Sequence, residues 1–451
     1  MTKLYEQNGF VTPFPYQQFV HSPYVPYYPE DIIYSTGSGR PFIVPYEYTG
    51  WRDEQLSWKK TAYLHGNLNP SPLFRFSGPD AKKFLSKYLV NTFEKFPIGS
   101  GKHAIACSER GYIASDGVIL RTDEDVYETY YMYSLSMALE NDLEKYDMAF
   151  EDLTPGAFLF QLGGPLSLQI LEAATGDDLH DIKFMRFRET SINGKKIRAV
   201  RLGMAGSLAY ELHGKLEDAH EIYDAIYQAG KPFGIRRLGW HAYMMNHTEN
   251  GFPQWGYHFD LDMPFLMNAA KILGSGGDET GLRNPFELGW GFVVKFDHDF
   301  IGREALGKIA ANPVRTTVSL EWNAEDIADV YKSLFEDGEP YKEFEQVNDF
   351  TQFKDGKIVR YQDKVLDKKG NAIGLSTGRA YSVYYQRMIS QCQIDLAYAK
   401  EGTDVIVLWG EPGTRQKEIR AKVARFPYYN ENDNRTFDVE TVPRVNQKAR
   451  L

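Results

Sequence analysis

Apolar and polar positions alternate along LGMAGSLAYELHG, residues 202–214, after a start that is rich in glycine. A period of two is typical of a β-strand, whose successive side chains point to opposite faces. The pattern therefore predicts that Glu211 lies on the face opposite to Tyr210 and Leu212. A carboxylate in that position has two interpretations, because it either faces water or is directed at a ligand.

Other segments carry apolar residues at helical spacing, which predicts helices. Pro79 and Asp80 suit the start of one helix, and Gly234 suits the end of another. The predicted helical segments are residues 51–64, 77–90, 164–175 and 216–234. Strands are predicted at LFQL (159–162) and GKKIRAVRLGMAG (194–206), and a hairpin entering a strand at GYIASDGVILR (111–121).

The pattern changes near Arg315, where short apolar runs begin to alternate with charged or glycine-containing turns, as in EGTDVIVLWG. Such spacing predicts a separate β-rich C-terminal domain. Within it, the charged stretch at residues 333–357 is expected to be a surface insertion. At the other end of the chain, TPFPYQQFVHSPYVPYYPE (12–30) is rich in proline and tyrosine, which predicts an extended arm.

Length and charge narrow the class of protein. A chain of 451 residues is too long for one compact core, so we expect two or three domains. A formal net charge of −10 argues against nucleic acid as a partner. The sequence has no apolar run of about eighteen residues and no apolar signal segment at its start, which predicts a cytoplasmic protein without a membrane anchor. Cys107 and Cys392 are too few for a disulfide framework and are expected to be buried or idle thiols.

Common catalytic motifs are missing: the sequence has no Walker loop, dinucleotide fingerprint or HExxH zinc helix. His241, His247 and His258 are its closest approach to a histidine cluster, and their loose spacing predicts no metal site. They lie in GWHAYMMNHTENGFPQWGYHFD (239–260), where aromatic residues are interrupted by glycine and proline. This segment has two interpretations, as core plus a turn or as a loop that lines a pocket for an aromatic ligand.

Several longer motifs stand out along the chain: GYIASDGVILR, FLFQLGGPLSLQIL, GMAGSLAYELHG, ENGFPQWGYHFD and FVVKFDHDFIGREAL. In this order they resemble motifs of the aminomethyltransferase family, the folate-binding T-protein of glycine cleavage. WRDEQLSWKKTA, VRLGMAG and VSLEWNAEDIADVYKSLFE are similar to a narrower group, the tetrahydrofolate-dependent aryl O-demethylases that act on vanillate, 3-O-methylgallate and syringate. The resemblance extends from Tyr48 to Pro427.

This resemblance implies an α+β fold, a three-domain cloverleaf with a central folate cavity. The folate-binding domain would be discontinuous and comprise residues 1–64 and 155–290. Residues 65–154 would form a second α+β domain, and residues 291–451 a β-rich, barrel-like C-terminal domain.

The resemblance also implies binding residues for tetrahydrofolate. Glu211 matches the glutamate that accepts the paired N–H donors of the pterin, which favours the ligand interpretation of this carboxylate. Asp116 matches an aspartate beside the reaction centre, and Phe184 an apolar position against the pterin. Trp255 and Tyr257 fall in a turn that the family uses near the cofactor.

The implied activity is transfer of a methyl group from a methoxylated aromatic compound to N5 of tetrahydrofolate, giving a phenol and 5-methyltetrahydrofolate. An aryloxide is a poor leaving group and needs a proton or hydrogen-bond donor. Glycine-cleavage proteins carry an arginine about where this chain has Tyr243, whereas the aryl O-demethylases carry a tyrosine. Tyr243 is therefore the predicted catalytic donor to the departing oxygen.

The substrate residues depart from the vanillate pattern. Asn67 and Asn69 stand where those enzymes have a glutamine and paired histidines, and Tyr131 falls where they have a basic residue. Tyr46 and Tyr48 are predicted wall residues. These differences predict a bulkier or less charged methoxyarene.

Three alternatives remain open at this point. A sulfonium or amine donor, such as dimethylsulfoniopropionate, suits a tyrosine-rich pocket and needs no acid. Glycine cleavage proper requires a lipoyl carrier, which the missing arginine and the acidic insertion make an unexpected partner. A folate-binding regulator without catalytic activity is the third alternative.

Overall fold

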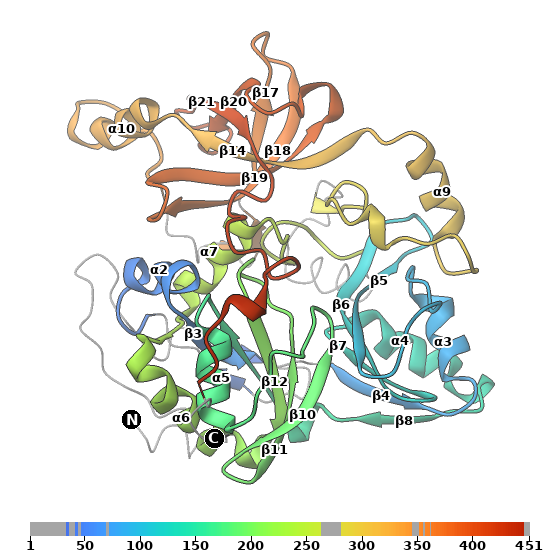
Figure 1. The fold of residues 1–451 in the computed structure, drawn as a ribbon. Coiled ribbons are helices and arrows are strands. Elements are labelled where there is room, and N and C mark those ends of the chain that lie inside the picture. Colours follow the sequence, from blue (N-terminus) through green and yellow to red (C-terminus); the bar gives the residue numbers. More distant parts are fainter. Residues whose placement is uncertain are drawn as a thin grey trace.

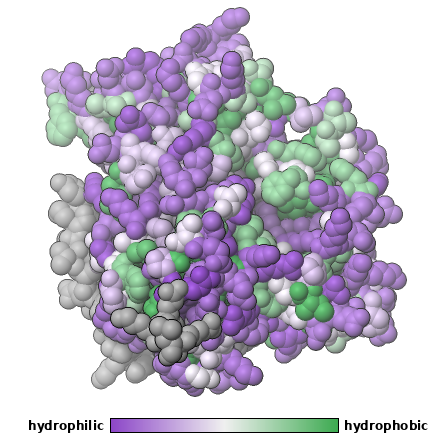
Figure 2. Space-filling model, viewed as in Figure 1, coloured by the Kyte–Doolittle hydropathy of each residue, from purple (hydrophilic) through white to green (hydrophobic). Residues whose placement is uncertain are grey.

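The computed structural model describes residues 33–35, 41–43, 47–68, 72–262, 281–344, 351–354, 357–360 and 362–445. The predicted N-terminal arm (12–30), Tyr46 and Asn69 lie outside these ranges, and the side chain of Asn67 is not described. Two sheets with their helices, the first mixed and the second antiparallel, lie below a β-barrel in the view of Figure 1. Hydrophilic residues cover most of the face shown in Figure 2.

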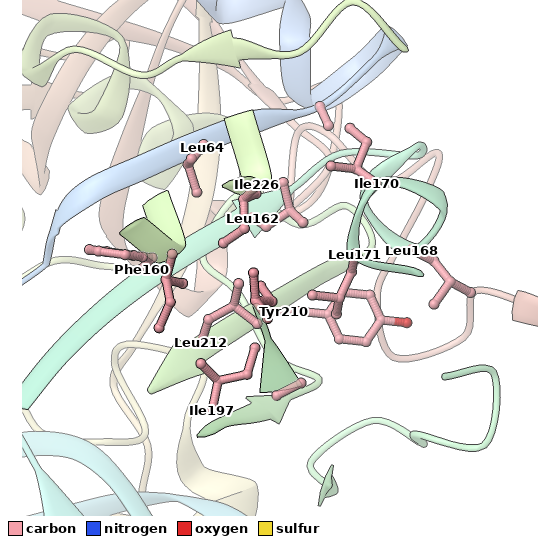
Figure 3. Packing of buried hydrophobic residues seen from close by; sticks show 14 of the residues in the cluster. Leu64, Phe160, Leu162, Leu168, Ile170, Leu171, Ile197, Tyr210, Leu212 and Ile226 are labelled. Carbon is pink, nitrogen blue, oxygen red and sulfur yellow. The ribbon is translucent and has the colours of Figure 1, made fainter. Parts of the chain in front are cut away.

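The first sheet has six strands in the order β10-β11-β12-β9-β3-β13. Helices α5 (Ser167–Thr175) and α6 (Ala219–Gly230) cover one of its faces. Leu162, Tyr210 and Leu212 point from this face into a buried core with residues of both helices (Figure 3). The strands are β3 (Tyr63–Leu68), β9 (Ala157–Gly163), β10 (Phe187–Ile192), β11 (Lys195–Val200), β12 (Ala209–Lys215) and β13 (Arg236–Arg237).

The second sheet has five strands in the order β5-β6-β7-β4-β8. Helices α3 (Ala81–Tyr88) and α4 (Tyr133–Asp142) flank its own aromatic core. Leu120 and Tyr130 of this sheet share a further buried cluster with Leu159 and Val200, so the two sheets are in contact. The strands are β4 (Leu73–Ser77), β5 (Ser100–Cys107), β6 (Ile113–Asp123), β7 (Val126–Tyr130) and β8 (Ala149–Asp152).

The β-rich region predicted from Arg315 onward is confirmed as a closed six-stranded barrel. Its strands are β14 (Arg315–Trp322), β17 (Gln362–Leu366), β18 (Ala372–Ser382), β19 (Arg387–Asp395), β20 (Asp404–Trp409) and β21 (Lys417–Ala424). Helix α10 (Ala324–Lys332) follows β14, and α9 (Arg303–Ala311) packs through Leu306 on the second sheet's side. Two hairpins complete the described strands, β1 (Ile33–Ser35) with β2 (Pro41–Ile43) and β15 (Thr351–Lys354) with β16 (Lys357–Arg360).

The domain boundaries remain a prediction, and two features bear on them. Strand β3 pairs with β9 of the first sheet although it extends beyond residue 64. After the barrel the chain returns to the first sheet, where Val439 and Val442 join its core. No helix within the described ranges has the length and apolar character needed to span a bilayer.

The helices predicted within residues 77–90, 164–175 and 216–234 are confirmed, and the one predicted at 51–64 is confirmed as the shorter α2 (Trp51–Lys60), because β3 begins at Tyr63. Helix α7 (Trp240–Asn250) was not predicted, so the interpretation of residues 239–260 as a loop is wrong for the first half of that segment. Every residue from His241 to Glu249 is buried, because α7 packs against α2 and against β18 and β19 of the barrel. A helix buried on all sides has no solvent-exposed face and therefore lacks the alternation of apolar and charged residues at 3.6-residue spacing.

Candidate functional site

Glu211 belongs to a row of side chains that crosses the first sheet. It lies opposite Val200 of β11 and Gln161 of β9, and Gln161 lies opposite His65 of β3. We call these four residues the Glu211 row. Glu211 is only 5% exposed, while Tyr210 and Leu212 pack into the core on the other face. The predicted alternation is confirmed, and a water-exposed Glu211 is excluded.

Hydrogen bonds fix the orientation of this carboxylate. The Tyr63 hydroxyl donates to Oε1 of Gln161, which turns the amide so that its Nε2 donates to Glu211 Oε1 at 3.3 Å. His213 places Nε2 3.6 Å from Glu211 Oε2. A carboxylate offers about four lone-pair positions, and a buried one is costly when they stay empty. The row therefore retains acceptor capacity for a ligand that brings N–H donors.

Tyr243 reaches the Glu211 row from α7. Its ring stacks on His65 with ring centres 4.4 Å apart, and its hydroxyl donates to Met204 Sδ at 3.5 Å. Burial, and then the charge of Glu211, raise the pKa of Tyr243 well above its ordinary value. Its phenol consequently stays protonated at neutral pH, and in this structure its proton is directed at Met204 Sδ.

Further polar residues on α7 were missed by the sequence analysis. Asn246, His247 and Asn250 fall at helical spacing on the face that carries Tyr243. Both amide atoms of the fully buried Asn246, Nε2 of His247 and Nδ2 of Asn250 have no hydrogen-bond partner among the described residues. Buried polar groups are normally paired, so this face is suited to a polar ligand. The helical spacing of these residues would have identified this face, but the sequence pattern did not predict α7.

Asp116 of β6 lies beside His103, whose Nε2 is 3.5 Å from Asp116 Oδ2. A series of ring contacts connects this pair with Tyr243. The ring centres are 5.2 Å apart for Tyr243 and His247, 6.1 Å for His247 and Phe252, and 5.5 Å for Phe252 and His103. The structure thus brings Glu211, Tyr243 and Asp116 into one connected cluster at the meeting of the two sheets and α7.

Of the other predicted cofactor residues, Trp255 and Tyr257 pack with members of this cluster, and the roles of all three remain predictions. Trp255 packs with Phe252 in an aromatic group beside the second sheet. Tyr257 is buried in the same cluster as Tyr243, and its hydroxyl donates to the carbonyl of Arg379 at 3.4 Å. Phe184 is half-buried in the turn that precedes β10.

The structure places the side chains of only two of the predicted substrate residues, Tyr48 and Tyr131. Tyr48 packs into the core on the face opposite to Glu211, and its role as a wall residue remains a prediction. Tyr131 lies at the contact between the two sheets with φ of 65°, a left-handed conformation that is uncommon outside glycine. Tyr46, Asn67 and Asn69 cannot be placed as side chains, since they lie outside the described ones.

The three histidines of residues 239–260 are used separately. His241 Nδ1 contacts Glu47 Oε1 at 3.0 Å, His247 Nδ1 contacts the Phe252 carbonyl at 3.0 Å, and His258 Nδ1 accepts from the Gln254 amide at 2.9 Å. The Nδ1 atom of each ring therefore serves the local fold. Both cysteines are buried thiols, as expected.

Comparison with known proteins identifies the family. The model of the GCVT N-terminal domain matches residues 68–269. Sesamin methylene transferase of Sinomonas sp. (strain No.22) is 43% identical and covers 89% of this chain and 94% of its own. Syringate O-demethylase of Sphingobium sp. (strain NBRC 103272 / SYK-6) is 34% identical, with 85% and 90% covered. The aminomethyltransferase of Lysinibacillus sphaericus (strain C3-41) is 27% identical, with 70% and 81% covered.

The fold agrees with this assignment. The crystal structure of the glycine cleavage system aminomethyltransferase T from Bartonella henselae superposes with a TM-score of 0.66. It covers 96% of this chain and 97% of its own at 18% identity. The predicted α+β fold of the aminomethyltransferase type is confirmed.

Tetrahydrofolate is the cofactor of this family, and the site residues fit it. The buried Glu211 carboxylate has protein donors near only part of its acceptor positions, which suits the paired N–H groups of a pterin edge. Gln161 and Tyr63 hold that carboxylate in place from one side. The chain is therefore a tetrahydrofolate-dependent methyltransferase of the aminomethyltransferase superfamily, close to the aryl O-demethylases.

Proposed function

We propose that this chain removes the methyl group of a methoxylated aromatic compound and transfers it to tetrahydrofolate. The observation that carries the proposal is the position of the buried Tyr243 side chain, which is stacked on His65 of the Glu211 row. Burial raises its pKa, so the hydroxyl keeps its proton at neutral pH. A proton donor at this place serves an ether, whose oxygen leaves with a negative charge. It serves no purpose for a sulfonium donor, whose leaving group is already neutral.

The chain's own residues would hold both reactants. Glu211, fixed by Gln161, accepts the N–H donors of the pterin, and Asp116 faces the cluster from the second sheet. Bound tetrahydrofolate supplies N5 as the acceptor of the one-carbon group. Alignment of donor, carbon and acceptor is a large part of such a reaction, so the rigid surroundings of these side chains matter for rate.

Tyr243 would act on the leaving oxygen. When the methyl carbon–oxygen bond breaks, its electron pair stays on the aryl oxygen, and the Tyr243 hydroxyl donates a hydrogen bond or its proton there. The parallel contact with His65 and the edge contact with His247 limit the movement of the Tyr243 ring. A donor that is already in position requires little reorganisation when charge develops.

The polar face of α7 contributes to the choice of aromatic substrate. The Asn246 amide has a donor and an acceptor without partners among the described residues, so it suits a hydroxyl or a second ether oxygen on the ring. An uncharged amide at this position agrees with a substrate less charged than vanillate.

A second candidate function is methylene transfer, in which the carbon bridging two aryl oxygens moves to tetrahydrofolate. The relative that is 43% identical over 428 residues carries the name sesamin methylene transferase, which favours this candidate. The role of Tyr243 is the same in both reactions, because each leaves an aryl oxygen that needs a donor.

The products distinguish these functions. Purified protein and tetrahydrofolate are incubated under anaerobic conditions with methoxybenzoates including syringate and vanillate, with sesamin, with dimethylsulfoniopropionate and with an aminomethyl donor. Mass spectrometry then measures the phenol and the folate product. A phenol with 5-methyltetrahydrofolate supports O-demethylation, and a catechol with 5,10-methylenetetrahydrofolate supports methylene transfer.

Turnover of only the sulfonium or the aminomethyl donor would overturn the proposal, and no turnover with any donor would favour the regulator. The variant Glu211→Gln serves as the control for the site. We expect it to weaken tetrahydrofolate binding about a hundredfold, because a charge-assisted pair of hydrogen bonds is lost. Glu217→Gln, at an exposed carboxylate in the 3-10 turn that follows β12, should bind normally.

A further inference from the structure

A line of polar contacts connects Glu211 with the second sheet through His213. His213 lies on β12 two residues after Glu211, so both side chains project from the same face. Its Nδ1 is 3.0 Å from the hydroxyl oxygen of Tyr130 on β7, and its Nε2 is 3.6 Å from Glu211 Oε2. All of these side chains are buried. Counting the hydrogen-bond donors and acceptors along the line therefore shows which atom carries each proton.

The first proton in question is that of Tyr130. Its hydroxyl donates to Glu128 Oε2 at 3.0 Å. Burial alone would raise the pKa of Glu128, but the charges and hydrogen bonds of Arg198 and Arg75 outweigh it and leave that pKa below its ordinary value. Glu128 is therefore an ionised carboxylate that can only accept. The single Tyr130 proton is committed to Glu128, and the Tyr130 oxygen must accept from Nδ1–H of His213.

The second nitrogen of His213 then has two states. In a neutral ring, Nε2 would present its lone pair to the negatively charged Glu211 Oε2, buried and with no hydrogen-bond partner among the described residues. In a protonated ring, Nε2 presents an N–H to the same oxygen. The second state replaces a repulsion between two acceptors with an attraction between opposite charges.

We propose that His213 is a positioning residue for Glu211, a doubly protonated imidazole whose Nε2–H faces Glu211 Oε2. The inference rests on the proposed folate site. With Gln161 donating to Oε1 and His213 directed at Oε2, each Glu211 oxygen keeps one acceptor position. Two remaining positions, one on each oxygen, match the two parallel N–H donors of a pterin edge.

The surrounding charges are compatible with a cationic ring. The Glu211 carboxylate lies at one end of the ring, and the Glu128 carboxylate lies beyond the Tyr130 hydroxyl at the other. Arg198, whose Nη1 is 3.5 Å from the Tyr130 oxygen, opposes the extra charge but is bound by Glu128 at 2.5 Å. Tyr63 and Tyr243 face Glu211 from the far side as neutral hydroxyls. The second cation, Arg75, is shared between Glu128 and Glu151.

The test is the pH dependence of tetrahydrofolate binding, measured by calorimetry between pH 6 and 8.5. For the unaltered protein we expect the affinity to fall about tenfold as pH rises and His213 loses its second proton. His213→Gln retains an N–H donor without the charge and should bind with little pH dependence. His213→Leu removes the donor and should bind about tenfold more weakly at pH 6. His220→Gln, at an exposed histidine of α6, is the matched control and should keep the normal profile.

An equal pH dependence in the unaltered protein and His213→Gln, or normal affinity in His213→Leu, would overturn the inference. Glu211→Gln separates it from the proposed site. If Glu211→Gln binds normally, the folate site itself is misplaced; if it fails to bind while both His213 variants bind normally, only the role of His213 is wrong. Nitrogen-15 NMR of the histidine rings in the ligand-free protein gives an independent result, since a neutral His213 at pH 6.5 would contradict the proposal even if a variant failed to fold.

Discussion

The ring of Tyr243 lies parallel to the imidazole of His65, with 9° between the two planes. His65 is itself fixed, because its Nδ1 lies 3.1 Å from the carbonyl oxygen of Leu238 and can donate to it. This contact joins α7 to β3 of the first sheet and helps to determine where the Tyr243 hydroxyl lies relative to Glu211. The proposed chemistry depends on this relationship, and the first prediction follows from it.

Replacing Tyr243 with phenylalanine should lower turnover of an aryl ether by about a hundredfold or more, the range of a lost general acid. The phenyl ring can keep the contact with His65, so tetrahydrofolate affinity should change little. Steady-state kinetics and calorimetry measure the two effects. Tyr127→Phe, a buried tyrosine in the core of the second sheet, is the control. Full turnover in Tyr243→Phe would remove the proposed role.

Gly163→Ala should weaken tetrahydrofolate binding without touching a binding residue. A Cβ at residue 163 would lie 2.7 Å from the hydroxyl and ring of Tyr63, which is fully buried and cannot move freely. Displacement of Tyr63 releases Gln161, which orients Glu211. We expect about a tenfold loss of affinity, equivalent to one hydrogen bond. Gly156→Ala, where the added Cβ meets nothing within 4 Å, is the control. Equal affinities for the two variants would contradict the proposed influence of Tyr63, through Gln161, on Glu211.

Stability should fall as the solution becomes acidic. Burial lowers the pKa of His65 and that of His247 from 6.5 to about 4. Between pH 6.5 and 4 the unfolded chain binds protons at these positions and the folded chain does not, so the free energy of unfolding decreases as pH falls through this window. Each histidine should account for about 2 kcal/mol between pH 7 and pH 5.

Urea denaturation of His247→Asn and of the unaltered protein at both pH values measures this contribution. The variant should lose less stability on acidification than the unaltered protein. The exposed His220→Asn should behave like the unaltered protein. A His247→Asn variant with the full acid sensitivity would show that His247 is protonated in the folded state.

A buried ion pair links α2 to α7, the helix that carries Tyr243. Lys59 Nζ donates to Glu249 Oε2, which also accepts from the Trp58 indole at 3.0 Å, and both charged side chains are fully buried. Lys59→Met leaves the Glu249 carboxylate buried without its cation, and should lower the free energy of unfolding by about 3–5 kcal/mol. Adding Glu249→Gln should restore part of the loss. If denaturant unfolding showed the double variant to be the less stable one, the charge argument would fail.

Local patterns in the sequence were sufficient for much of the fold. Alternation placed Glu211 opposite Tyr210 and Leu212, helical spacing placed α2, α3, α5 and α6, and the change of pattern at Arg315 marked the barrel. These features depend on which side of a single helix or strand is buried. The spacing of apolar residues within that element is enough to show this side. The resemblance to folate enzymes added the identity of Glu211 and Tyr243 as candidates.

Only the tertiary structure decided what surrounds those candidates. Helix α7 is buried on all sides, so its sequence carries no amphipathic period, and the polar face with Asn246 was concealed. Tyr48 was placed in the core because sheet packing, not sequence position, selects the face its ring meets. His213 acquires its significance from Tyr130 on another sheet. Contacts between residues distant in sequence depend on how the sheets and helices pack, and no local pattern records that packing.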